Sequence, residues 1–104
     1  MTLTPSQIEV LARFDGWSIS DKGWYSKGGV TFDNEVAPYK MQVHLTSSGV
    51  LIEMRLKVLK QFQKMEGMYG EEVKFNEEVT DLILSGEYTA AAIKTSELIQ
   101  KLEA

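Results

Sequence analysis

The segment from residue 48 to residue 66 carries more apolar side chains than one face of a helix can hold. One stripe at helical spacing consists of Val50, Leu51, Met54, Val58, Phe62 and Met65. A second set, formed by Ile52, Leu56 and Leu59, widens the apolar surface to well over half of the circumference. A helix this apolar must be covered on two sides. The sequence therefore predicts that it lies at the centre of the domain or forms half of an interface between copies of the chain.

The length and the absence of cysteine restrict the remaining choices. A chain of 104 residues supports one core, so residues 1–104 are predicted to form a single domain. The lack of cysteine excludes a disulfide framework, thiolate chemistry and the usual zinc ligands. The N-terminal segment lacks the basic and apolar regions of a signal peptide, and no apolar run is long enough to span a membrane. We therefore expect a cytoplasmic protein without membrane contact.

The first element is predicted by its start and stop signals. Thr4 and Gln7 have the spacing of a capping box, and Pro5 takes the first helical position, where proline is tolerated. Gly16 can end the helix in a left-handed turn. These signals predict a helix over residues 5–15.

After this helix the apolar residues alternate with polar ones, which is typical of strands. Two tight turns are indicated, one by Asp21-Lys22-Gly23 and one by Gly28-Gly29. They separate a strand that begins at Trp17 from strands over residues 24–27 and 30–32. The prediction is a three-stranded antiparallel meander whose buried face carries Trp17, Ile19, Val30, Phe32 and either Trp24 or Tyr25.

The rest of the chain is less regular. Alternation over residues 40–45 favours a fourth strand, and residues 73–75 suit a short edge strand, although both assignments stay open. A short helix capped by Asn76 and a last helix over residues 89–102 complete the chain. The predicted fold is α+β, with a three- to four-stranded antiparallel sheet (a meander) and three to four helices packed on it.

The net charge of −4 is unevenly distributed. Residues 50–66 carry a net charge of +2, whereas residues 67–104 carry a net charge of −5. The simplest explanation is that the basic helix and the acidic tail face each other. Duplex DNA binding requires a net positive face, which only the middle segment offers, so a nucleic-acid partner is disfavoured.

Residues suited to chemistry are few and scattered. His44 is the only histidine, and without cysteine or a second histidine it belongs to no metal cluster of these types. The pairs Glu71-Glu72 and Glu77-Glu78 are adjacent in sequence, so on a helix their side chains diverge. The sequence contains no nucleophile elbow and no phosphate-binding loop. We therefore expect a protein that is not an enzyme and that uses no metal or cofactor.

One aromatic pair indicates a surface for interaction. Trp24 and Tyr25 are neighbours on a predicted strand, so their rings point to opposite faces of the sheet. One ring then belongs to the core, and the other is covered by another element, covered by a partner or left partly exposed. The candidate interaction surface consists of Trp24, Tyr25, Tyr39, Ile52, Leu56 and Leu59.

Four short motifs precede or open the apolar helix: Phe14-Asp15-Gly16-Trp17, Trp24-Tyr25, Pro38-Tyr39 and Leu45-Thr46-Ser47. Their order resembles small phage and prophage proteins of the phage α/β/α-sandwich type, over roughly residues 1–60. In that pattern the last two motifs are contiguous, whereas here residues 40–44 separate them. The resemblance implies a compact α/β domain of phage or mobile-element origin and brings no catalytic residues.

Three functions are compatible with these features. The leading prediction is a non-enzymatic interaction protein, an accessory factor of a phage or mobile element that binds a protein partner. The first alternative is a structural homo-oligomer that uses the long helix over residues 48–66, since exposed apolar helix faces indicate a partner. The second alternative is a weak binder of single-stranded nucleic acid or of a small ligand, through the side of Trp24 and Tyr25 together with Lys40.

Overall fold

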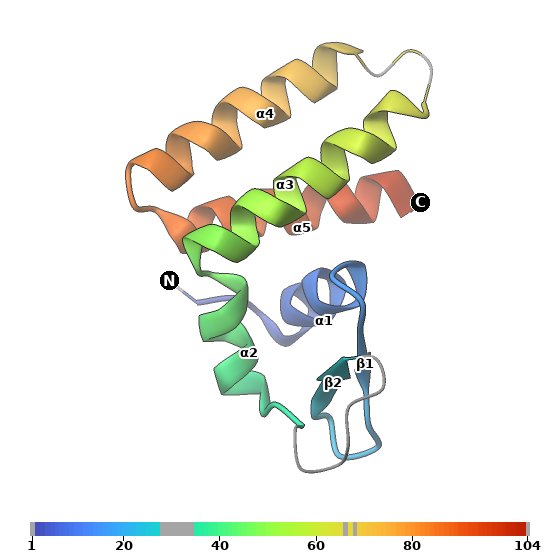
Figure 1. Cartoon of the computed structure of the whole chain (residues 1–104), viewed down its shortest axis with the longest axis vertical. Helices are drawn as coiled ribbons and strands as arrows, with labels where there is room; N and C mark the ends of the chain where they lie inside the picture. The colour runs from blue at the N-terminus through green and yellow to red at the C-terminus, as the bar shows by residue number, and fades with distance from the viewer. Residues whose placement is uncertain (1, 28–34, 66, 68, 104) are drawn as a thin grey trace.

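The computed structural model describes residues 2–27, 35–65, 67 and 69–103. Within these ranges the chain forms five helices and one two-stranded antiparallel sheet (Figure 1). The elements in chain order are α1 (Pro5–Phe14), β1 (Trp17–Ile19), β2 (Tyr25–Lys27), α2 (Pro38–Leu45), α3 (Ser48–Gln63), α4 (Tyr69–Leu84) and α5 (Tyr88–Glu103). The predicted α+β fold with a three- to four-stranded sheet is therefore wrong, because helices dominate the described residues.

The first hairpin was predicted correctly. Strands β1 and β2 pair in antiparallel register, with Ile19 opposite Tyr25, and Gly23 in the connecting turn has a φ of +79°. Tyr25 of β2 also forms an isolated antiparallel bridge with Val36. The predicted third strand over residues 30–32 and its Gly28-Gly29 turn lie outside the described residues.

The predicted fourth strand over residues 40–45 is wrong, because this segment is the helix α2. Pro38 occupies its first turn, where the missing N–H costs nothing. Met41 and Leu45, one helical turn apart, are both fully buried, whereas Val43 between them is 71% exposed. Met41 and Leu45 fit both alternation and helical spacing, whereas Val43 fits alternation alone, and its exposure decides for the helix.

The predicted edge strand over residues 73–75 is wrong, and so is the predicted start of the following helix at Asn76, although the residues after Asn76 are helical as expected. Both segments belong to one helix, α4, which begins soon after Gly67, a residue with a φ of +82°. Phe75 and Val79 are buried one turn apart and give this helix its core face. Gly70 lies within its first turn, so it does not interrupt it.

Three helix predictions are confirmed. Helix α1 has the full capping box, in which Gln7 N donates to Thr4 Oγ1 and Thr4 N donates to Gln7 Oε1. Helix α3 ends at Gln63, three residues earlier than expected, and α5 extends the predicted last helix by one residue at each end. The core face of α3 consists of Leu51, Met54, Val58 and Phe62.

The helices form two groups that meet at α5. Figure 1 shows α3, α4 and α5 together at one end of the molecule, and α1, α2 and the hairpin at the other. Helix α5 packs against α1, α3 and α4. One hydrophobic cluster includes buried residues of α1, β2 and all the later helices. In this arrangement α2 and α3 each keep exposed apolar side chains on their outer surfaces.

The predicted opposition of basic and acidic segments is only partly realised. Helix α3 does pack against the acidic helix α4, but Arg55 donates to the neutral groups Asn76 Oδ1 at 2.6 Å and Thr80 Oγ1 at 3.4 Å. The ion pairs that α4 makes within the described residues are with lysines of α5. The positive charges of α3 therefore do not neutralise α4 directly.

Candidate functional site

Trp24 and Tyr25 differ in burial, as expected for neighbouring residues of an extended chain, whose side chains point to opposite faces. Tyr25 is opposite Ile19 in the hairpin and is buried in the core, where burial and the nearby charge of Glu9 raise the pKa of its phenol. Trp24, just before β2, is exposed. Of this pair, Trp24 is the ring available to a partner.

Helix α3 presents an exposed apolar stripe on the side away from its core face. We name Ile52 and Leu56 the α3 stripe; they lie one turn apart and are 41% and 48% exposed. Leu59 continues the stripe and is partly buried against the core. On α4, exposed Val73 lies one turn before Asn76, the residue that receives the Arg55 guanidinium. Val73 is therefore a further exposed apolar side chain on the helix that packs against α3.

One edge of the α3 stripe is bounded by two opposite charges. Glu53 and Lys60 are both exposed and are seven residues apart, which places them on the same side of the helix two turns from each other. Neither forms an ion pair with another residue of the described ranges. The other edge is closed by Arg55, which α4 holds. A partner therefore has access from the Glu53 and Lys60 side.

A second apolar area lies on α2. Tyr39 and Val43 are one turn apart, and each is 71% exposed. They occupy the face of α2 opposite Met41 and Leu45, which are fully buried. The residues of the predicted interaction surface thus belong to different elements: the hairpin, α2 and α3.

A cluster that no sequence pattern predicted is centred on Asp15, whose side chain is only 4% exposed. Trp17 Nε1 donates to Asp15 Oδ2 at 3.0 Å, and Lys57 Nζ donates to Oδ1 at 3.2 Å. Lys27 Nζ donates to Oδ2 at 3.4 Å, and His44 Nε2 lies 3.8 Å from the same oxygen. We call these five residues the Asp15 cluster. It joins the end of α1 to both strands, α2 and α3.

The charges of this cluster favour an ionised carboxylate. Burial by itself raises the pKa of Asp15, but the hydrogen bonds from Trp17 and Lys57 and the positive charges of Lys27 and Lys57 outweigh it. The net pKa is therefore below its ordinary value. One buried carboxylate faces two ammonium groups, so the cluster carries a local positive excess at neutral pH.

The Asp15 cluster has the character of a structural junction. The Trp17 ring meets the His44 ring edge-on at 5.5 Å, and Lys27 Nζ lies 5.5 Å from the Trp17 ring centroid. Trp17 is partly buried and packs against the core, as its predicted place on the buried face requires. Within the described ranges, no serine, threonine or tyrosine hydroxyl donates a hydrogen bond to Asp15 or to His44.

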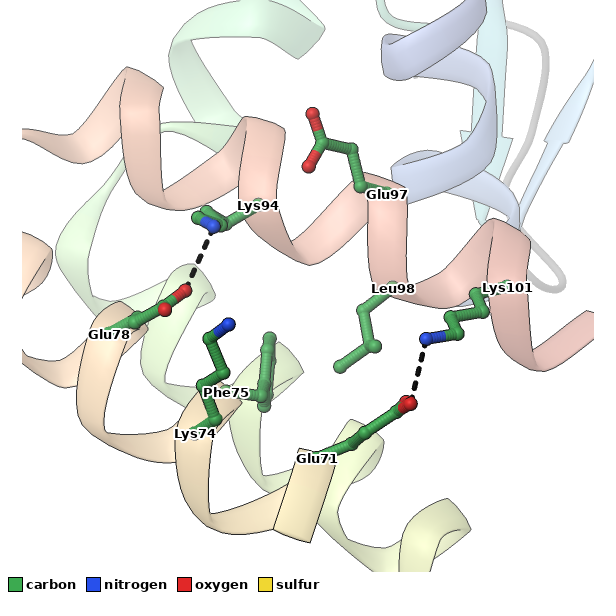
Figure 2. Close-up of a pocket in the computed structure, with 8 residues that line it drawn as sticks. All are labelled: Glu71, Lys74, Phe75, Glu78, Lys94, Glu97, Leu98 and Lys101. Atoms are coloured by element: carbon green, nitrogen blue, oxygen red, sulfur yellow. Dashed lines mark hydrogen bonds and ion pairs between the residues drawn. The ribbon is translucent and has the colours of Figure 1, made fainter. Parts of the chain in front are cut away.

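A shallow cleft of about 290 Å³ lies between α4 and α5 (Figure 2). Its lining residues are Glu71, Lys74, Phe75, Glu78, Lys94, Glu97, Leu98 and Lys101. Two ion pairs cross it at 2.8 Å, Lys94 with Glu78 and Lys101 with Glu71. The hydrogen bond between Lys94 and Glu78 lowers the pKa of the carboxylate and raises that of the amine. Ion pairs between its own lining residues therefore connect the two sides of the cleft.

Other classes of site find no support in the described ranges. No group of three or more histidine, aspartate or glutamate side chains there is placed to hold a metal ion. Nor does any described helix have the length and apolar character of a membrane span. Comparison of the chain with protein-family models, curated proteins and solved structures finds no match.

Proposed function

We propose that this chain is a non-enzymatic interaction protein that binds a protein partner through the α3 stripe. The observation that carries the proposal is that α3 is apolar on two sides. Its core face is fully buried, while Ile52 and Leu56 on the other side remain about half exposed. Covering both residues on binding removes apolar surface from water, which favours association.

The clustering of these residues matters more than their exposure. Single exposed apolar residues are normal on a protein surface, whereas contiguous ones mark interaction sites. Ile52 and Leu56 are adjacent on one helix, and Leu59 extends the same stripe. Full burial of a large aliphatic side chain stabilises by about 1.5–3 kcal/mol. A few such residues therefore supply a binding surface without any catalytic group.

The sequence motifs imply a phage or mobile-element origin. As part of this proposal, we expect the partner to occur in the same biological setting. The Asp15 cluster and the cleft between α4 and α5 are not needed for it. Tyr39 and Val43 form a separate area on α2, which the proposal does not require.

Site-specific photo-crosslinking in the native cell tests the proposal. A photoreactive amino acid at Leu56 is expected to form a defined crosslinked product with a protein. The matched control is the same amino acid at Gln100, an exposed position on α5. Equal crosslinking at both positions, or none at Leu56, would contradict the proposal.

A further inference from the structure

We infer that the partner of the α3 stripe is a second copy of this chain, whose own α3 packs against it in antiparallel orientation. This inference rests on the proposed function and specifies the partner. It follows from the spacing of the apolar residues, the position of the charges beside them and the closure of one edge by α4.

The apolar residues of the stripe have the spacing of a helix–helix seam. Ile52, Leu56 and Leu59 are separated by four and three residues, which is the alternation of the a and d positions in a coiled coil, and the polar residue Gln63 follows four residues later at the next a position. An antiparallel arrangement with Leu56 opposite Leu59 of the second copy places Ile52 opposite Gln63. The two-fold axis of the dimer generates each of these two pairs twice. One register therefore covers all four positions of the seam.

The charges select the antiparallel orientation. Glu53 and Lys60 flank the seam on the same edge, at the e positions of this heptad. In the antiparallel register each Glu53 lies beside Lys60 of the other copy, which forms two symmetric ion pairs. In a parallel pair, identical residues lie at the same level, and neither charge meets its opposite on this edge. One surface thus supplies both halves of a complementary interface.

The fold leaves this edge accessible and closes the other. Arg55, on the opposite side of the seam, is held by Asn76 and Thr80 of α4. The second helix therefore approaches from the side of Glu53 and Lys60, both of which are exposed. A helix of 16 residues is about 24 Å long, which limits the contact to less than the area typical of permanent dimers. We expect a reversible dimer that dissociates on dilution.

Sedimentation velocity of the purified full chain, from low micromolar to near-millimolar concentration, tests the inference. The wild type is expected to shift from monomer to dimer as concentration rises. Leu56→Glu is expected to remain monomeric at every concentration, because it places a carboxylate at the centre of the seam. The matched control is Val43→Glu on α2, equally apolar and more exposed, which is expected to dimerise like the wild type.

A charge-exchange series tests the orientation without touching the core. Glu53→Lys and Lys60→Glu are each expected to raise the dissociation constant about tenfold or more, since like charges then face each other. The double variant, which restores opposite charges in the antiparallel register, is expected to return to within about threefold of the wild type. Because both residues are exposed, these variants keep the inference testable even if Leu56→Glu fails to fold, which far-UV circular dichroism would reveal.

A wild type that stays monomeric throughout would overturn the inference, as would equal loss of dimer in Val43→Glu and Leu56→Glu. Failure of the double variant to recover would overturn the antiparallel register. These results are distinct from failure of the proposed function: crosslinking of Leu56 to a different protein, with a monomeric purified chain, refutes self-association alone. Absence of crosslinking at Leu56 refutes the proposed function itself.

Discussion

At the scale of single residues, Asp15 takes part in more long-range side-chain polar contacts than any other residue of the described ranges. Its carboxylate receives hydrogen bonds from Trp17, Lys27 and Lys57, which come from β1, β2 and α3. The two lysines are 12 and 42 residues away in the sequence. No local pattern indicates contacts over such separations, which explains why the cluster was not predicted. The only local signal is an aspartate that follows a helix and precedes a glycine and a tryptophan.

Replacing Asp15 tests its role as a junction. Asp15→Ala is expected to lower the free energy of unfolding by about 2 kcal/mol, because hydrogen bonds to a charged group are lost and the indole N–H loses its acceptor. Asp15→Asn is expected to cost less, since an amide oxygen can still accept from Trp17. Urea unfolding followed by circular dichroism measures both values. Wild-type stability in Asp15→Ala would show that the cluster is incidental.

The lowered pKa of Asp15 predicts a dependence of stability on pH. In the unfolded chain the carboxyl binds its proton at a higher pH than in the folded protein, so acid favours unfolding. The contribution is complete above about pH 5 and is lost as the pH falls through the ordinary value and then the lowered one. Urea titrations between neutral pH and pH 3 should therefore show a shallower decline for Asp15→Asn than for the wild type. Parallel curves would mean that the folded carboxyl titrates normally.

At the scale of elements, local signals predicted those helices whose ends and apolar faces are unambiguous. Helix α1 has a capping box and a terminal glycine. The apolar face of α3 runs along a helix of 16 residues, which is longer than a usual strand. Helix α2 is short, and its two core residues, Met41 and Leu45, fit alternation as well as helical spacing. Helix α4 contains Gly70 near its start, which imitates a break. In both cases the decision comes from packing against α3 and α1 or α5, which no local window contains.

Local sequence patterns also predicted the interaction surface only in part. The sequence identified Ile52, Leu56 and Leu59 as an excess over one helix face, and the structure leaves the first two about half exposed. It did not separate Trp24 from Tyr25, because that choice depends on which face of the hairpin meets the core. The exposure of Val43 was hidden by its assignment to a strand.

A pair of truncations in α2 distinguishes helix from strand in solution. Met41→Ala is expected to cost about 2–5 kcal/mol, because a fully buried side chain is removed. Val43→Ala is expected to change stability by less than about 0.5 kcal/mol, since Val43 points away from the core. In a strand the two residues would share one face and lose similar amounts. Similar costs for both variants in urea unfolding would therefore contradict the helix.

At the scale of the whole molecule, α5 links the two groups of elements. It packs against α1 on one side and against α3 and α4 on the other, and its core face includes Ala91, Ala92 and Ile99, all fully buried. Small residues at the first two positions allow close approach of the neighbouring helices. Together with the Asp15 cluster, α5 connects the group of α1, α2 and the hairpin to the group of α3 and α4. We therefore expect the chain to unfold as one cooperative unit, in accord with the prediction of a single domain.

The two tryptophans allow this cooperativity to be measured. Trp17 lies in β1 and Trp24 just before β2, so fluorescence follows the hairpin region, while far-UV circular dichroism follows the helices. Ile99 lies where α1, α3 and α5 meet, since it borders the same hollow as Phe14 and Gln61. Ile99→Ala is expected to cost about 2–5 kcal/mol and to shift both transitions together.

An exposed residue of α4 provides the control for this substitution. Leu84, at the end of the helix, is 80% exposed, so Leu84→Ala is expected to change stability by less than about 0.5 kcal/mol. If Ile99→Ala shifted the dichroism transition and left the fluorescence transition in place, the hairpin region would be stable without α5. The fold would then consist of two independent units, and the α3 stripe would belong to the helical unit alone. Coincident shifts instead mean that a partner bound at α3 stabilises the hairpin as well, because binding to the native state raises the stability of the whole cooperative unit.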